Sequence, residues 1–203
     1  MVKRILLYGE IPEYTYLYID DKTLHGFLID PGYDPYNILD VINSNHFVIE
    51  KILITHGHYD HIGACLELSK LLNVDIYSYS DEYLINPNLN LSFYSKPIII
   101  NNSKRVGSRV TLDSNPDFYL DVIYTPGHTK DSVIYVNKDD LVGFVGDVIF
   151  KDSYGRYDLP GGDKKELMNS IYNIILKLPK DMVLYSGHTI EAKVSDELDI
   201  VIY

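Results

Sequence analysis

The sequence predicts an α/β fold in which short strands alternate with amphipathic helices. Runs rich in β-branched and aromatic residues, bounded by turn residues, recur along the chain and predict strands. Between them, apolar side chains recur at helical spacing, as for Cys65, Leu68 and Leu72, which fall on one helical face. With 203 residues, 46% of them hydrophobic, the chain can bury a sizeable core. We therefore treat residues 1–203 as one domain.

Each element is bounded by its own local signals. The predicted strands, which are short apolar runs between turn residues, are 4–8, 15–19, 26–29, 51–54, 119–125, 132–136, 141–145 and 182–186. The predicted helices are 34–44, 62–72 and 164–178. Asp163, followed three residues later by Glu166, forms a capping-box-like start for the last helix, and Pro179 ends it. Residues 85–117 are rich in Asn, Ser and Pro, which predicts irregular structure with isolated strands. A loop of this length in a compact domain more often has a function than none.

Net charge and composition limit the classes of partner that the protein can bind. Eighteen basic and 29 acidic residues give a net charge of −11, which opposes binding to phosphate backbones or anionic lipid, so we expect neither nucleic acid nor a membrane as partner. No apolar run approaches the roughly 20 residues of a membrane span, and the start of the chain lacks a secretory signal pattern. A single cysteine excludes an intrachain disulfide. We expect a cytoplasmic protein that acts on a small-molecule substrate, and homo-oligomer formation stays open.

Three histidines and an aspartate lie within six positions, in the stretch THGHYDH (Thr55–His61). His56 and His58 are two residues apart, so they point the same way from a strand or extended turn. Asp60 and His61 follow as the chain turns into a predicted helix, and they approach from a second direction. Burying four such side chains would be costly without a metal or charge partners. The stretch therefore predicts a metal site that two adjacent ions can share.

Three later positions repeat one pattern, in which an apolar strand leads to a small residue and then to a possible metal ligand. They are His128 in VIYTPGHT, Asp147 in VGFVGD and His188 in VLYSGHT. The glycine before each permits a tight turn close to a metal. Strand ends gathered along one edge of a sheet sandwich can assemble a site from distant segments. His25 and His46 lie outside the pattern, and we expect surface or structural roles for them.

The set THGHYDH, TPGHT, GD and a final GHT resembles the metallo-β-lactamase superfamily, and the likeness runs from LIDPG (Leu28–Gly32) to the last histidine. It is closest to the short glyoxalase II-like (hydroxyacylglutathione hydrolase-like) branch, because GDVIFKDSYGRYDLPGGD is similar to a segment of that branch. The resemblance implies a four-layered αββα sandwich with a metal site at one edge of its two sheets. It also implies a ligand set: His56, His58 and His128 for the first metal, Asp60, His61 and His188 for the second, and Asp147 bridging them.

The ligand types suit divalent metals. Imidazole and carboxylate favour Zn²⁺, Fe²⁺ or Mn²⁺, and no thiolate stands among them to indicate a structural zinc. We expect two ions, with zinc preferred over iron or manganese. Two ions about 3.5–4 Å apart can share a water and supply a bridging hydroxide at neutral pH, without a covalent protein nucleophile. By resemblance, Asp60 is also catalytic, orienting the hydroxide, whereas Cys65 is expected to pack as a small apolar side chain.

A thioester is the expected substrate. Its leaving thiol has a pKa near about 8.5 and departs with little help from a general acid, and the sequence shows no separate acid. The resemblance places a basic substrate-binding residue at Arg156, whose fork suits a carboxylate, and the alternative is a structural pair with Asp158 or Asp163. Lys151 and Tyr157 are weaker candidates of the same kind.

Two departures argue against a glutathione thioester. Full-length glyoxalase II enzymes carry a C-terminal helical domain that helps to bind glutathione, but this chain ends soon after His188. The final ligand also stands in SGHTIEAKV, without the proline and glycine that usually flank it in that branch. We therefore expect no separate C-terminal glutathione-binding domain. A smaller or different thiol carrier would bind to residues 85–117 and to the segment around Arg156.

The same superfamily supplies the alternatives. A persulfide dioxygenase would hold a single iron through His56, His128 and Asp147, so the number of metals separates it from a two-metal hydrolase. A diiron electron-transfer protein shares the fold, but it carries an acidic residue at the position of His58 and a partner flavin domain. The charge of −11 disfavours a nuclease. A non-catalytic metal-binding module is the remaining alternative.

Overall fold

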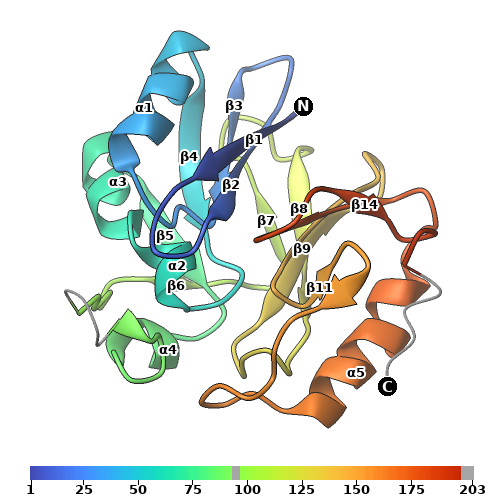
Figure 1. Cartoon of the computed structure of the whole chain (residues 1–203). Coiled ribbons are helices and arrows are strands. Elements are labelled where there is room, and N and C mark those ends of the chain that lie inside the picture. The colour runs from blue at the N-terminus through green and yellow to red at the C-terminus, as the bar shows by residue number, and fades with distance from the viewer. Residues whose placement is uncertain (93–96, 198–203) are drawn as a thin grey trace.

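The structure, a computed structural model, describes residues 1–92 and 97–197, and its elements form four layers (Figure 1). Two six-stranded sheets pack face to face. Helices α1 and α3 cover the outer face of one sheet, and α5 covers the outer face of the other. This is the αββα sandwich that the resemblance implied.

The first sheet has the strand order β1-β2-β3-β4-β5-β6. Its strands are β1 (Val2–Leu7), β2 (Glu13–Ile19), β3 (His25–Ile29), β4 (Val48–Leu53), β5 (Asp75–Ser78) and β6 (Lys104–Arg105). From β3 onward the strands are parallel, so each connection must cross over the sheet. Those connections contain α1 (Pro35–Ser44), α2 (Tyr59–Ile62), α3 (Cys65–Leu72) and α4 (Glu82–Ile85). As a result, the carboxyl ends of β3 and β4 meet at one edge.

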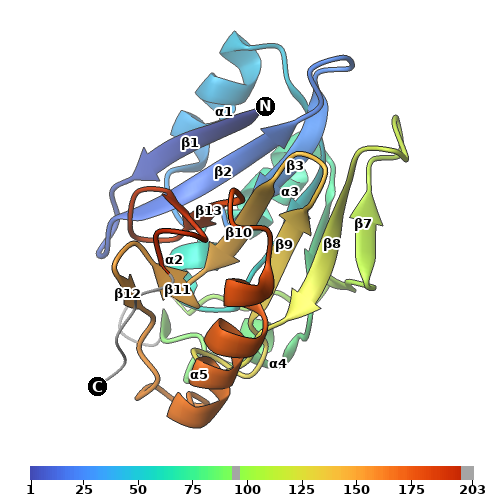
Figure 2. The same cartoon turned by 90° about the vertical axis from the view of Figure 1, so that its right-hand side faces the viewer.

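The second sheet has the strand order β14-β13-β10-β9-β8-β7. Its strands are β7 (Arg109–Thr111), β8 (Tyr119–Tyr124), β9 (Val133–Asn137), β10 (Val142–Gly146), β13 (Val183–Ser186) and β14 (Ala192–Lys193). The hairpin β11 (Ile149–Phe150) and β12 (Ser153–Tyr154) and then α5 (Lys164–Asn173) connect β10 to its parallel neighbour β13. Figure 2 shows α5 crossing the outer face of this sheet.

Alternation along β2 divides its side chains between two cores. Leu17 and Ile19 face the helices and pack in the same cluster as Cys65, which is fully buried. Tyr16 and Tyr18 point the other way, into the core between the sheets. Cys65 therefore packs as a small apolar residue, as the sequence predicted.

The helix predicted over 62–72 is wrong at its start, because the chain forms two short helices, α2 and α3, on either side of residues 63 and 64. The backbone N–H of Ala64 donates to the carbonyl of Pro31 at 2.9 Å, in the loop that follows β3. The break fixes α2, which carries two of the predicted ligands, against the end of β3.

The helix predicted over 164–178 is wrong in its last turn. Asp163 caps it as expected, accepting from the N–H of Glu166 at 2.9 Å. After Asn173, however, the backbone tightens into a 3₁₀ turn, η2 (Ile175–Lys177), whose hydrogen bonds reach back three residues.

The long loop predicted over 85–117 is mostly irregular between 97 and 117, apart from the short strands β6 and β7. Residues 93–96 of that loop, and 198–203 of the tail, lie outside the described residues. Within the described ranges, no helix combines the length and the apolar character needed to cross a membrane.

Candidate metal centre

The predicted ligands lie together at one edge of the sandwich, on segments that follow strands of both sheets. The loop after β4 leads into α2, and further loops follow β8, β10 and β13. Because β8, β10 and β13 run in the same direction, their carboxyl ends meet at this edge. The seven residues gathered there are His56, His58, Asp60, His61, His128, Asp147 and His188.

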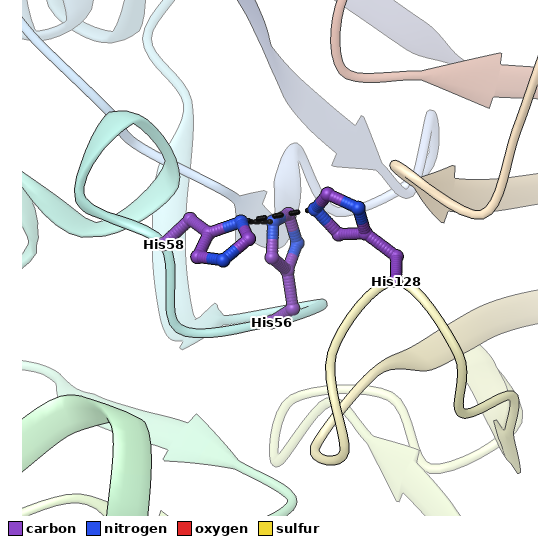
Figure 3. A group of neighbouring side chains, drawn as sticks. All are labelled: His56, His58 and His128. Carbon is purple, nitrogen blue, oxygen red and sulfur yellow. Dashed lines mark hydrogen bonds between the residues drawn. The ribbon is translucent and has the colours of Figure 1, made fainter. Parts of the chain in front are cut away.

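Three imidazole rings face one another in the first cluster (Figure 3). Nδ1 of His58 lies 3.1 Å from Nε2 of His56 and 2.9 Å from Nε2 of His128. Burial lowers the pKa of all three rings, to about 3 for His58, with neighbouring imidazoles adding to the shift of His56 and His58. The rings are therefore neutral at pH 7 and can offer lone pairs to a cation.

The second cluster is built around carboxylates. Nε2 of His188 lies 3.3 Å from Oδ2 of Asp60 and 3.2 Å from Oδ2 of Asp147. Nε2 of His61 lies 3.4 Å from Oδ1 of Asp147. Because Oδ2 of Asp147 is also 3.6 Å from Nε2 of His128, this one carboxylate faces both clusters.

Ion pairing dominates the electrostatics of the second cluster. Burial disfavours charge on His188, but hydrogen bonds to Asp147 and Asp60 outweigh it and raise its pKa to about 10. The pKa of His61 is likewise raised against burial by Asp147, while the pKa values of Asp60 and Asp147 are lowered. These imidazoles hold protons that a divalent ion would have to displace.

Asp30 orients Thr55 and the ring of His61 beside the two clusters. It accepts hydrogen bonds from the backbone N–H of Thr55 at 2.7 Å and from its hydroxyl at 2.5 Å, and it lies 3.0 Å from Nδ1 of His61. Sequence reasoning missed this role, although Asp30 directly follows a buried strand, as the ligands do. Such contacts fix the ring and its tautomer, so that Nε2 of His61 faces the second cluster.

Two further rings are anchored by backbone carbonyls. Nδ1 of His128 lies 2.7 Å from the carbonyl oxygen of Arg156, and Nδ1 of His188 lies 2.7 Å from that of Pro12. A carbonyl can only accept, so each ring donates its Nδ1–H and turns Nε2 toward the clusters. Both rings are thereby oriented for ligation.

The donor set fits divalent metal ions. Nε2 of His61 and Oδ1 of Asp147 are buried and make no hydrogen bond within the described residues, although they lie 3.4 Å apart. Nitrogen and oxygen donors of this kind suit Zn²⁺, Fe²⁺ or Mn²⁺. Ligand atoms lie within 4.8 Å of one another in three sets, which are His56, His58 and His128; Asp60, His61 and His188; and Asp30, His56 and His61. The third set shares one ring with each of the other two.

Glycines allow the close approach of the ligand-bearing turns, as the sequence predicted. Gly146 has a φ of 49°, and a Cβ there would lie 2.4 Å from the hydroxyl of Thr55. A Cβ at Gly187 would lie 2.5 Å from Oδ1 of Asp147. A larger residue at either position would push Asp147 or the His56 turn out of place.

A cavity of about 720 Å³ opens over both clusters. Apart from the ligands, its walls are mainly apolar and aromatic, with Ile11, Tyr59, Leu91, Phe150, Tyr154, Leu159 and Pro160. Asn88 and Leu91 come from the long loop that the sequence marked as a binding segment.

Of the three predicted substrate-binding residues, one lines the cavity and two do not. Arg156 lines the cavity, but its Nε and Nη2 donate to the two carboxylate oxygens of Asp158 at 2.8 and 2.9 Å, which is one of the two pairings considered from sequence. Lys151 is exposed and does not line the cavity. Tyr157 is also absent from its walls, and its ring lies under Nζ of Lys164 at 5.6 Å from the centroid. Carboxylate binding by Arg156 stays a prediction.

Asp131 supports the turn that carries the first cluster, and it provides a pH-dependent prediction. It is 4% exposed, accepts from the hydroxyl of Thr129 at 2.6 Å, and has its pKa raised to about 7 by burial. Between about pH 4 and pH 7 the folded chain therefore binds more protons at this site than the unfolded chain, so stability is lost as pH rises through this window.

We expect Asp131→Asn to make the pH dependence of the unfolding free energy shallower, by up to about 1.4 kcal/mol per pH unit between pH 5 and pH 7. Urea denaturation of the metal-free wild type and variant at several pH values measures this difference. Parallel stability curves for the two proteins would contradict the assigned titration.

Comparison with known proteins agrees with this geometry. The family model described as "Metallo-beta-lactamase superfamily" matches residues 8–188. A probable metallo-hydrolase of Bacillus subtilis, YqgX, is 34% identical, with 94% of this chain and 92% of the relative covered. The hydroxyacylglutathione hydrolase GloC of Haemophilus influenzae is 28% identical, with 83% of this chain and 82% of the relative covered.

Solved structures show the same likeness. The BLEG-1 B3 metallo-β-lactamase superposes with a TM-score of 0.89 at 32% identity, with 98% of this chain and 97% of that chain covered. TTHA1623 in a di-iron-bound form superposes with a TM-score of 0.85 at 27% identity, with 98% of both chains covered. With the four-layered sandwich and the clustered His and Asp side chains, these matches show that the chain belongs to the metallo-β-lactamase superfamily.

Proposed function

We propose that the protein is a metal-dependent hydrolase of thioesters that uses two metal ions, with zinc preferred over iron or manganese. When bound, the ions would supply Lewis acidity that lowers the pKa of a water and polarises the substrate carbonyl. The residues that would hold them are His56, His58 and His128 for one ion, Asp60, His61 and His188 for the other, and Asp147 for both.

The position of Asp147 carries this proposal. Its Oδ2 lies 3.2 Å from a ring nitrogen of the second cluster, on His188, and 3.6 Å from one of the first, on His128. A site for a single metal ion needs only one set of ligands. Two complete sets joined by one carboxylate favour a hydrolase with two ions over a mononuclear dioxygenase.

The surrounding residues prepare the site for attack on a carbonyl. Pro12 and Arg156 hold the rings of His188 and His128 through their carbonyls, so the ligands need little reorganisation. Asp60 stays ionised because hydrogen bonding to His188 and the charge of His61 outweigh its burial, so its carboxylate can accept a hydrogen bond from a water beside it and orient that water. The apolar walls limit access of bulk water.

The chemistry of the leaving group favours thioesters as substrates. An amine leaving group must be protonated as it departs, whereas a thiol with a pKa near about 8.5 leaves readily as a thiolate. Among the described residues, the ionisable side chains around the cavity besides the predicted ligands are Glu10, Tyr59, Tyr154 and Arg156, and none of these is a buried carboxylic acid that could donate a proton. The name of the GloC relative, a hydrolase of a glutathione thioester, supports the same choice.

The test compares substrate classes on protein stripped with a chelator and then reloaded with Zn²⁺ or Fe²⁺. We expect thioester hydrolysis that disappears with the chelator and returns with metal, and little hydrolysis of the matching amides. Absence of thioester turnover in the reloaded protein would refute the proposed activity. Oxygen consumption with a persulfide, in place of hydrolysis, would support the dioxygenase.

Arg156 and Asp158 provide a matched pair of variants for substrate binding. We expect Arg156→Ala to raise KM about tenfold for carboxylate-bearing thioesters with little change in kcat, because uniform binding sets KM. Asp158→Asn should lower KM for the same substrates, because it releases the guanidinium from its partner. Steady-state kinetics measures both, and an unchanged KM in both variants would contradict a substrate-binding role.

A further inference from the structure

A second cavity, of about 740 Å³, adjoins the cavity over the metal clusters. Its floor is apolar and is formed by Tyr33, Ala64, Leu66, Pro97, Ile98 and Ile99. Glu10 and Tyr59 line both cavities, so the two cavities adjoin at these side chains.

Tyr59 forms the partition between the cavities. Its ring meets that of Tyr33 edge to face, with 6.5 Å between centroids, and its hydroxyl lies 3.4 Å from Oε2 of Glu10. The next residue along the chain is the predicted ligand Asp60. One side of this partition therefore borders the reaction centre, and the other borders the apolar trough.

The charges around the trough disfavour an anionic occupant. Among the residues that the structure describes, its charged side chains are the carboxylates of Glu10, Asp34 and Glu67 and the ammonium group of Lys70, so negative charge is in excess. Arg156 lines the metal cavity but not the trough, and it is hydrogen-bonded to Asp158. An uncharged aliphatic group suits the trough, and the polar part of a substrate suits the wall at Arg156.

We propose that this trough is an acyl-chain subsite, and that the enzyme acts on thioesters of aliphatic acyl chains longer than the metal cavity alone can hold. The proposal rests on the proposed thioester hydrolysis. The carbonyl would lie over the metal clusters, the thiol would leave along the Arg156 wall, and the chain would pass the edge formed by Tyr59 and Glu10. Burial of each further methylene in the trough would then increase binding.

The test uses acetyl, hexanoyl and decanoyl thioesters of N-acetylcysteamine, a small neutral thiol that keeps the leaving group constant. We expect KM to fall by up to about fourfold per methylene that the trough buries. Turnover of all three substrates with the same KM would overturn the subsite and leave the hydrolase intact. Tighter binding of a glutathione thioester than of the decanoyl substrate would also overturn it.

A binding measurement is independent of turnover. Calorimetry of the metal-free protein with acetyl and decanoyl amide analogues, which lack the labile bond, should show binding of the decanoyl compound only. If neither analogue binds more tightly than the other, the trough is not a subsite. Failure of the proposed hydrolysis would appear as decanoyl binding without turnover of any thioester by the metal-loaded enzyme.

Two exposed residues provide the matched variants. Ile99 lines the trough and is 44% exposed, whereas Leu71 is 52% exposed on α3 and lines neither cavity. We expect Ile99→Asp to lower the ratio of decanoyl to acetyl kcat/KM at least about tenfold, because a charge would enter the path of the chain. Leu71→Asp should leave that ratio unchanged. Equal effects of the two variants would overturn the assignment.

Discussion

An Asp147→Ala variant should lose most of its bound metal and at least about 100-fold of its thioester hydrolysis. One carboxylate lies within 3.6 Å of ring nitrogens on His61, His128 and His188, so its removal affects both ligand sets at once. Elemental analysis of dialysed protein, with circular dichroism as a check on folding, measures the loss of metal directly.

The control for this variant is an exposed aspartate on the outer helix α1. Asp40→Ala should leave both metal content and hydrolysis at the wild-type level, because Asp40 is exposed on α1 and belongs neither to the ligand sets nor to the lining of the metal cavity. A folded Asp147→Ala protein with undiminished metal stoichiometry would contradict the bridging position assigned to the carboxylate.

An Asp30→Ala variant should lose about 3–5 kcal/mol of unfolding free energy and bind metal about 10- to 100-fold more weakly. Asp30 is 3% exposed, and its removal would leave the Thr55 N–H and hydroxyl and the His61 ring without their buried acceptor. Urea denaturation measures the first effect, and competition with a chromogenic chelator measures the second.

Asp30→Asn is the matched control. Asn tolerates the φ of 49° at this position and keeps one carboxamide oxygen as an acceptor, so a smaller loss of stability is expected. If the alanine and asparagine variants are equally stable and bind metal like the wild type, Asp30 does not orient the site.

Much of the fold and site could be predicted because the relevant signals are local. The eight predicted strands all correspond to observed strands, with ends that differ by at most three residues. The predicted ligands lie on segments that follow strands, with Asp147 directly after β10 and with Asp60 and His61 on α2 in the connection after β4. Parallel strands bring such segments to one edge. The pattern of strand, glycine and possible ligand therefore predicted residues that lie together in the structure, and their role as metal ligands stays a prediction.

The features of the fold and site that were not predicted depend on contacts that no sequence pattern indicates. The carbonyls that orient the ring nitrogens belong to Pro12 and Arg156, and any residue can supply a carbonyl. The strand β5 was missed because its four residues begin with Asp75 and show no long apolar run. Likewise, the sequence offered two partners for Arg156, and only the folded chain shows the pair with Asp158.

Titration of chelator-stripped protein with Zn²⁺, while hydrolysis of one acyl thioester is followed, tests the two-metal hydrolase most directly. In the proposed two-metal hydrolase, both ligand sets, which Asp147 joins, would have to be filled for full activity. We therefore expect the rate to keep rising until two equivalents of metal per chain are bound and then to level off. A rate that is complete at one equivalent, or no hydrolysis with two equivalents bound, would contradict it.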